Sequence, residues 1–194
     1  MNRLVALLSV LLVISGCSSF SKQIQPAGED SAEKPLSIGL KTAFKLLPPE
    51  QGPAPVLLKQ IVTMEARGDQ DRFIGVVRIG KERVQMVGLL PTGQQLFSLD
   101  YGGKTLTQEN SSYADIPGQE ILTIMQFALW PESSIRQHYP ENSGWDSDFS
   151  PSQRTLEKNG QELLDVKYFG DELVIRNHLG HYRILIKILE KIEL

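Results

Sequence analysis

The sequence contains a single cysteine, Cys17, among its 194 residues. A chain with one cysteine cannot form an intramolecular disulfide, so this thiol needs another explanation. The sequence also lacks a basic block, because 20 lysines and arginines stand against 23 acidic residues, for a net charge of −3. A mildly acidic chain of this kind disfavours nucleic-acid binding and attachment to anionic lipid through basic side chains.

Catalytic and metal-binding motifs are missing as well. The Gly-x-Ser-x-Gly pattern of many hydrolases is absent, and Gly102-Gly103-Lys104-Thr105 lacks the preceding glycine of a phosphate loop. His178 and His181 fall on a predicted hairpin turn without a cysteine or a compact carboxylate cluster, which favours surface histidines over a zinc site. Asp146 and Asp148 are better explained as polar residues near a strand end than as an acid–base pair. We therefore expect neither an enzyme nor a cofactor.

The apolar run near the N-terminus is too short to be a comfortable membrane span. It extends from Leu4 to Ile14 and follows the positive charge of Arg3. Ile14-Ser15-Gly16-Cys17 then looks like a bacterial lipobox, in which cleavage falls before the cysteine and the cysteine is acylated. We therefore expect residues 1–16 to be a lipoprotein signal peptide. An ordinary secretory signal with an incidental cysteine is the alternative.

Residues 17–35 are expected to form the lipidated cysteine and a flexible tether. Beyond Cys17 this segment is rich in Ser, Glu, Gln, Lys, Pro and Gly, a composition that buries too little apolar surface to fold. Several acyl chains on one cysteine suffice for stable anchoring. Ser18 occupies the position at which an aspartate retains many enterobacterial lipoproteins at the inner membrane, so location at the outer membrane is favoured. We expect the remaining residues, 36–194, to form a domain that faces the periplasm.

Antiparallel strands are the main element predicted for residues 36–194. A first strand is expected from Val56 to Ala66, and a meander follows to about Gln108, with Gly-containing turns at short intervals and apolar residues at every second position. In this pattern Phe73, Gly75, Val77 and Ile79 face one side of the sheet. From Gly144 the same rhythm predicts five more strands, 145–149, 154–158, 163–168, 173–178 and 182–190.

Two helices are predicted between the two sets of strands. Residues 117–129 repeat apolar side chains at intervals of three and four, around most of the helix circumference. Pro131 is well placed to be the first residue of a second short helix that ends near Tyr139. Leu36 to Leu47 is ambiguous and compatible with a further short amphipathic helix. The first helix is either a plain core element or a lid over an apolar cavity.

The predicted fold class is therefore mainly β with helices (α+β). A twisted sheet of about ten strands tends to curl, and its concave face must then be filled by the apolar helices. Inward apolar residues of such a domain are either packed core or the wall of a ligand cavity, and the alternation does not separate the two. The candidates for a cavity wall are Met64, Phe73, Val77, Val84, Met86, Phe97, Leu99, Ile121, Met125, Ile184 and Ile186.

Several short motifs, in their order and spacing, resemble those of a known superfamily. They are residues 92–103 (TGQQLFSLDYGG), 128–131 (ALWP), 143–145 (SGW) and 182–186 (YRILI). The chain resembles the LolA/LolB superfamily of lipoprotein carriers and receptors. Within it, the chain is similar to a family of LolB-like outer-membrane lipoproteins of unknown function, often encoded with aryl polyene biosynthesis genes.

The resemblance implies an unclosed antiparallel half-barrel whose concave apolar face is covered by helices. It also implies that acyl chains bind in that cavity, and that a protruding loop inserts into membrane, for which Leu89-Leu90-Pro91 is the candidate here. We therefore expect non-catalytic binding or transfer of a lipid-like molecule, either a lipoprotein acyl group or a polyene glycolipid. The expected partners are the membrane, through the N-terminal acyl chains, and a periplasmic carrier or envelope export component. A tethered adaptor that docks another protein is the alternative.

Overall fold

The computed structural model describes residues 36–38, 42–112 and 116–194, which belong to one compact unit of the chain. The signal peptide and the tether predicted for residues 1–35 lie outside the described residues. Two strands, β1 (Leu36–Ile38) and β2 (Thr42–Phe44), pair with each other. The remaining strands are β3 (Val56–Ala66), β4 (Asp69–Ile79), β5 (Val84–Leu89), β6 (Gln95–Tyr101), β7 (Leu106–Asn110), β8 (Trp145–Phe149), β9 (Gln153–Lys158), β10 (Gln161–Phe169), β11 (Glu172–Asn177) and β12 (Tyr182–Glu193).

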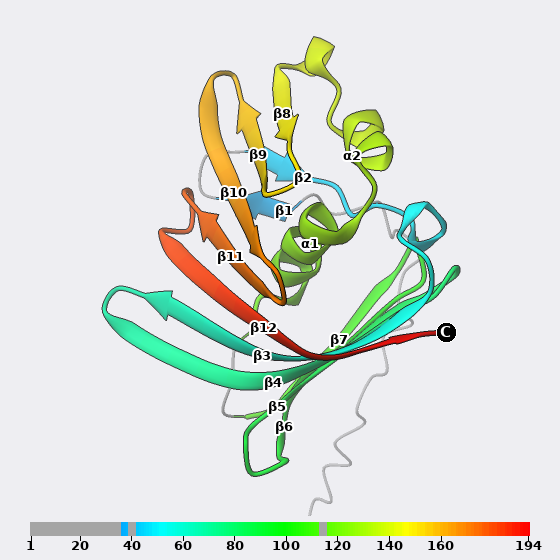
Figure 1. Cartoon of the computed structure of the whole chain (residues 1–194), viewed down its shortest axis with the longest axis vertical. Coiled ribbons are helices and arrows are strands. Elements are labelled where there is room, and N and C mark those ends of the chain that lie inside the picture. Colours follow the sequence, from blue (N-terminus) through cyan, green and yellow to red (C-terminus); the bar gives the residue numbers. More distant parts are fainter. Residues whose placement is uncertain (1–35, 39–41, 113–115) are drawn as a thin grey trace, which may run out of the picture. The chain divides into compact units, whose positions relative to one another are not determined.

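These ten strands form one antiparallel sheet in the order β7-β6-β5-β4-β3-β12-β11-β10-β9-β8. Each set of strands is a meander, and the long strands β3 and β12 pair along their length to join the two sets, from Ala66 opposite Tyr182 to Val56 opposite Glu193. Within the described residues, β7 and β8 are the two edges, so the sheet is not closed. The sheet curves around the helix that fills its concave side (Figure 1). The predicted fold class, a curled antiparallel sheet of about ten strands with central helices, is confirmed.

The helices are α1 (Gly118–Leu129) and α2 (Glu132–His138), accompanied by the short 3-10 turns η1 (Pro49–Gln51) and η2 (Glu141–Ser143). α1 is apolar around most of its surface, and it is correspondingly buried from Leu122 to Ala128. α2 begins one residue later than predicted, because Pro131 has an extended conformation and caps the helix instead of starting it. No helix among the described residues is long and apolar enough to cross a membrane.

The alternation predicted for the strands is confirmed by burial. In β4 the residues Phe73, Gly75, Val77 and Ile79 are buried, while their neighbours are half-buried or exposed. β5 and β6 show the same period of two. The side chains on this concave face form the core together with α1, because a half-buried strand hides every second side chain.

The ambiguous segment from Leu36 to Leu47 is not a helix in its described residues, which instead contain β1 and β2. Long-range packing explains this outcome. Phe44 is buried, and its ring centroid lies 6.0 Å from that of Tyr139 and 5.5 Å from that of Trp145. The Tyr139 hydroxyl also donates to the Lys45 carbonyl at 3.1 Å. Tertiary contacts of this kind override a weak local helical period.

Candidate functional site

An apolar cavity of about 60 Å³ lies between α1 and the concave face of the sheet. The sheet contributes residues from β3, β4, β5, β11 and β12, and α1 contributes most of the opposite wall. Gly75 has no side chain, Gln60 has a polar one, and the side chains of the other lining residues are apolar. The lining residues are Leu58, Gln60, Val62, Met64, Phe73, Gly75, Met86, Ile116, Ile121, Ile124, Met125, Ala128, Leu129, Leu173, Ile175, Ile184, Ile186 and Ile188.

Methionine is concentrated at this cavity. The chain has four methionines, and the three that follow Met1, namely Met64, Met86 and Met125, all line the cavity. They come from two different strands and from α1. Methionine side chains are unbranched and adapt to irregular apolar shapes, so this wall can change its contour at low cost.

A row of four residues across β3, β4, β5 and β6 forms part of the concave floor. Gln60 lies opposite Gly75, Gly75 opposite Gly88, and Gly88 opposite Phe97. The two adjacent glycines carry no side chains, and the side chains of their neighbours occupy the space above them. The Phe97 ring covers Gly88 so closely that a Cβ there would lie 2.2 Å from its Cε1 atom. The Gln60 side chain covers Gly75, where a Cβ would lie 3.2 Å from Cγ and Nε2.

The N-terminal part of α1 is held by polar contacts to the sheet. Glu120 accepts hydrogen bonds from the Tyr182 hydroxyl and, at 2.9 Å, from Asn177 Nδ2, which tie the helix to the turn joining β11 and β12. Burial raises the pKa of Tyr182 above its ordinary value, and the hydrogen bond to Glu120 and its negative charge raise this pKa further. On the other side, Gln108 of β7 accepts from the Gly118 amide at 3.2 Å and donates to the Ile116 carbonyl at 2.6 Å.

The C-terminal part of α1 is held by its backbone carbonyls. Arg154 Nη1 donates to the carbonyls of Phe127 at 2.9 Å and Trp130 at 2.7 Å, and the Tyr168 hydroxyl donates to that of Ala128 at 2.8 Å. A cation at the end of a helix also favours the helix dipole. Burial raises the pKa of Tyr168 to about 12, and the positive charge of Arg154 partly offsets this effect.

Seven of the eleven residues predicted for a cavity wall line this cavity. They are Met64, Phe73, Met86, Ile121, Met125, Ile184 and Ile186. The structure does not place the other four on the wall, because Val77, Val84, Phe97 and Leu99 are almost fully buried in the neighbouring core. Ligand binding by the seven stays a prediction.

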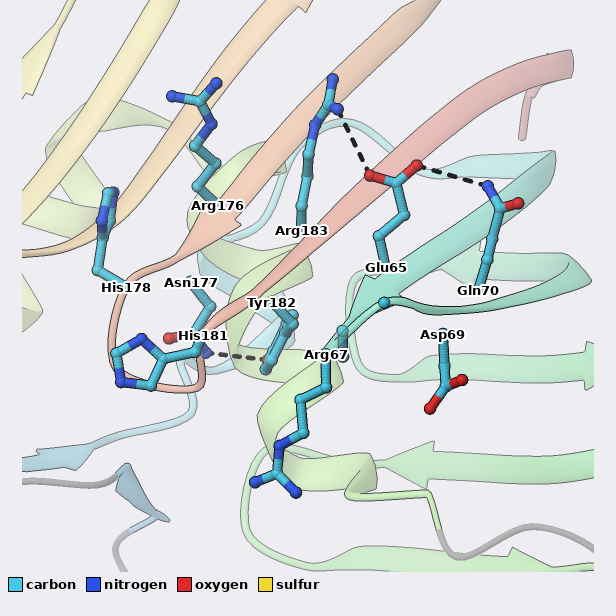
Figure 2. A pocket seen from close by; sticks show the side chains of 12 residues that line it. Glu65, Arg67, Asp69, Gln70, Arg176, Asn177, His178, His181, Tyr182 and Arg183 are labelled. Atoms are coloured by element: carbon cyan, nitrogen blue, oxygen red, sulfur yellow. Dashed lines mark hydrogen bonds and ion pairs between the residues drawn. The ribbon is translucent and has the colours of Figure 1, made fainter.

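A second, polar pocket of about 620 Å³ lies between the turn joining β3 to β4 and the turn joining β11 to β12 (Figure 2). Glu65 contacts Arg183 at 3.4 Å and accepts a hydrogen bond from Gln70 at 3.4 Å. Arg176 lies directly opposite Arg183 on the neighbouring strand. The pocket is open to solvent and mixes both signs of charge, so its ion pairs are screened and weak.

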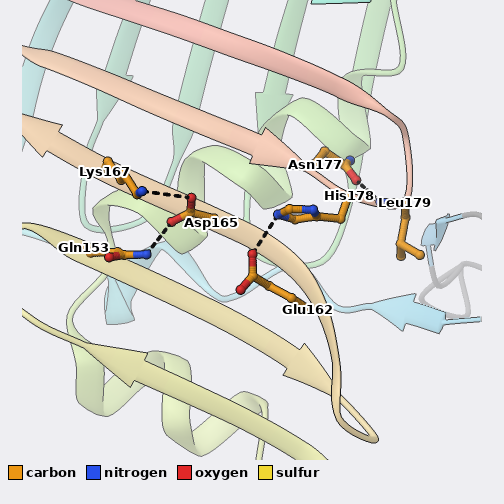
Figure 3. A network of polar contacts seen from close by, with 7 residues as sticks. All are labelled: Gln153, Glu162, Asp165, Lys167, Asn177, His178 and Leu179. Carbon is orange, nitrogen blue, oxygen red and sulfur yellow. Dashed lines mark hydrogen bonds and ion pairs between the residues drawn. The ribbon is translucent and has the colours of Figure 1, made fainter.

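The predicted turn histidines lie near this pocket. His178 Nε2 contacts Glu162 Oε1 at 2.7 Å, next to a separate contact in which Gln153 donates to the buried Asp165 carboxylate at 2.8 Å (Figure 3). His181 lies in the turn that joins β11 to β12. Across the described ranges, no group of three or more His, Cys, Asp or Glu side chains could hold a metal ion.

The remaining motifs lie on hairpins and strand surfaces. Residues 102–105 form the turn between β6 and β7, where the Gly102 amide donates to the Thr105 carbonyl at 3.3 Å. Asp146 and Asp148 are exposed on the outer face of β8. Leu89-Leu90-Pro91 lies at the start of the turn between β5 and β6, and both leucines are half-buried. None of these residues lines the apolar cavity.

Sequence reasoning missed the polar residues of the site. Gln60 is the polar exception of the cavity wall, and Glu120 and Arg154 hold α1 over the cavity. One signal was available for Gln60, a polar side chain at an inward position between Leu58 and Val62. The anchors of α1 join residues far apart in the sequence, so no local pattern marks them.

Comparison with known proteins gives a family and a structural neighbour. The family described as "Protein of unknown function (DUF3261)" matches residues 57–190. No curated protein matches the chain. Among solved structures, the crystal structure of a LolA superfamily protein from Nitrosomonas europaea is similar with a TM-score of 0.40 and 8% sequence identity, over 74% of this chain and 89% of that one. The part of the resemblance that points to a family of unknown function is confirmed by the family match.

Proposed function

The chain belongs to the DUF3261 family of proteins of unknown function, and we propose that its cavity binds a lipid-like apolar molecule. The binding is non-catalytic and serves to hold or transfer the molecule. The observation that carries this proposal is the cavity between α1 and the sheet, whose wall is apolar apart from one side chain and contains three methionines. Ligand sites of this kind are concave and mostly apolar, with few polar groups.

Binding requires α1 to move. The cavity of about 60 Å³ is well below the roughly 300–1,000 Å³ of pockets that hold a drug-sized ligand. α1 covers the cavity as one element and is held by polar contacts at each end and by the hydrogen bonds of Gln126 to Leu47, none of which belongs to the strand pairing. Displacement of the helix therefore enlarges the cavity without breaking the sheet. Each methylene group enclosed contributes about 0.8 kcal/mol to binding, which offsets the cost of moving the helix.

The proposed setting is the bacterial outer membrane. Acylation of Cys17 would anchor the chain, and residues 18–35 would allow the domain to reach on the order of 24 Å from its anchor. The lipid-like molecule would be a lipoprotein acyl group or a polyene glycolipid. A periplasmic carrier or an envelope export component would deliver or accept it.

A substitution that fills the cavity tests the proposal. Met64 lines the cavity and is only half-buried, so Met64→Trp adds a large side chain to the wall with limited strain. Thr63→Trp is the matched control, because Thr63 precedes it on β3 and faces the opposite side of the sheet. The full chain, recovered from its own cell envelope, is examined by native mass spectrometry and solvent extraction. We expect a lipid-like molecule with the wild type and Thr63→Trp, and several-fold less with Met64→Trp.

An empty protein that also refuses fatty-acid probes would overturn the proposal. The second candidate function, a tethered adaptor that docks another protein, would then be favoured. One observation supports it. Four large apolar side chains near the C-terminal end of β12 and the turn after β10 are exposed, namely Phe169 (59%), Leu189 (48%), Ile192 (42%) and Leu194 (58%).

A further inference from the structure

Among the described residues, Gln60 is the only one with a polar side chain on the wall of the apolar cavity. It lies in the middle of β3 between Leu58 and Val62, which line the same cavity, and only 7% of its surface is exposed. A glutamine at this place carries one acceptor oxygen and two N–H donors into an otherwise apolar space.

The carboxamide of Gln60 has no hydrogen-bond partner anywhere in the described ranges. The other buried glutamine behaves differently. Gln126 accepts from the Leu47 amide at 2.9 Å and donates to the Leu47 carbonyl at 2.7 Å, so both ends of its carboxamide are satisfied. Among the described residues, the fully buried side-chain atoms without a partner belong to Gln51, Ser111 and Arg183, so the unpaired Gln60 carboxamide keeps some accessible surface. An unpaired and accessible carboxamide in an apolar cavity calls for a functional explanation.

The sheet is shaped to keep this carboxamide at the cavity. Gly75 lies directly opposite Gln60 on β4 and has no side chain, so the Gln60 side chain rests over it. A water molecule here would need two to four polar partners, and the other lining side chains are apolar. A polar atom within an apolar ligand suits the Gln60 carboxamide better than a water molecule does. The apolar part of the ligand holds that atom in place, so the atom does not need further polar partners.

We propose that Gln60 is a specificity residue that hydrogen-bonds a neutral oxygen within the apolar ligand, such as a mid-chain hydroxyl or an ester carbonyl. A neutral oxygen fits because the carboxamide is itself uncharged and no cationic side chain of the described residues lines the cavity, so a carboxylate placed beside Gln60 would be buried without a counter-ion. This inference rests on the proposed function of the cavity and adds the chemical class of its ligand. Plain hydrocarbon chains would leave the carboxamide unpaired and bind less tightly.

Displacement of a fluorescent fatty acid from the full chain tests the inference. The competitors are octadecanoic acid and a series of its hydroxy analogues with the hydroxyl at successive positions along the chain. We expect the wild type to prefer one mid-chain hydroxy analogue over the plain acid by about tenfold, the ratio that one good hydrogen bond supplies. Gln60→Met, which keeps the length of the side chain without its polar atoms, should lose this preference and bind the plain acid at least as tightly as the wild type.

Gln161→Met is the matched control, because it makes the same change at an exposed position of β10 and should keep the wild-type preference. If Gln60→Met does not fold, Gln60→Leu replaces it in the same experiment. If both proteins bind the competitors and the wild type prefers the hydroxy analogue no more than the folded Gln60 variant does, the role of Gln60 is refuted. The proposed function of the cavity would still stand. Failure of every competitor to bind either protein would refute both.

Discussion

At the scale of single residues, the packing of α1 on the concave face separates the core from the cavity wall. Phe97 and Leu99 lie on the concave face, as the alternation of β6 predicts, and they belong to the core and not to the cavity wall. Gly118, at the start of α1, packs so closely on the sheet that a Cβ there would lie 2.4 Å from Leu99 Cδ2. The place where α1 packs on the sheet depends on long-range contacts, and the alternation of residues along a strand does not predict it.

Gly88 is a position where packing leaves room for glycine alone. We expect Gly88→Ala to lower the free energy of unfolding by about 1–3 kcal/mol, because the new Cβ would overlap the fully buried Phe97 ring. Chemical denaturation followed by circular dichroism measures this change. Gly102→Ala is the control, since a Cβ at Gly102 meets no atom within 4 Å, and it should leave stability nearly unchanged. Equal stability of the two variants would show that Phe97 can move away from Gly88.

At the scale of elements, most strands and both helices could be predicted because their signals are local. Alternation, glycine turns and the prolines around α1 mark them within a few residues. The exceptions are β1 and β2, where the packing of Phe44 against Tyr139 and Trp145 decides the structure, and the attachment of α1. The contacts that hold α1 join it to side chains of β7, β9, β10 and β11 and to the backbone of Leu47.

The Glu120 contact is expected to control how readily α1 leaves the cavity. Glu120→Ala removes the acceptor for the Tyr182 hydroxyl and Asn177, so the N-terminal part of the helix loses this polar attachment to the sheet. We expect ligand entry to become several-fold faster and amide hydrogen exchange in α1 to increase, since local opening costs less free energy. Stopped-flow binding of a fluorescent fatty acid and hydrogen exchange measure the two effects.

Glu141→Ala is a suitable control for this element, because Glu141 is an exposed acidic residue in η2, away from α1. Its entry rate should equal that of the wild type. An unchanged entry rate in Glu120→Ala, together with faster exchange in α1, would mean that the ligand enters without displacement of this end of the helix.

At the scale of the whole molecule, the sequence predicts two meanders and intervening helices, whereas the pairing that joins the meanders comes only from the structure. β3 and β12, the first and last strands of the sheet in sequence, pair over their full length and place both meanders on one curved surface. This pairing brings Met64 opposite Ile184 and Val62 opposite Ile186, all of which line the cavity. The cavity is therefore a product of the complete domain and not of either meander alone.

The attachment of the molecule to a membrane is expected to depend on one residue. Acyl chains on Cys17 would hold the chain at the membrane, because more than one chain on a single residue gives stable anchoring. We expect Cys17→Ala to move the protein from the membrane fraction to the soluble fraction and to remove the mass of the acyl groups. Cell fractionation and mass spectrometry of the intact protein measure both outcomes.

Ser18→Asp is the control, because it keeps the cysteine and should stay membrane-bound, but in the inner membrane. Recovery of Cys17→Ala in the membrane fraction would show that another part of the chain carries the attachment.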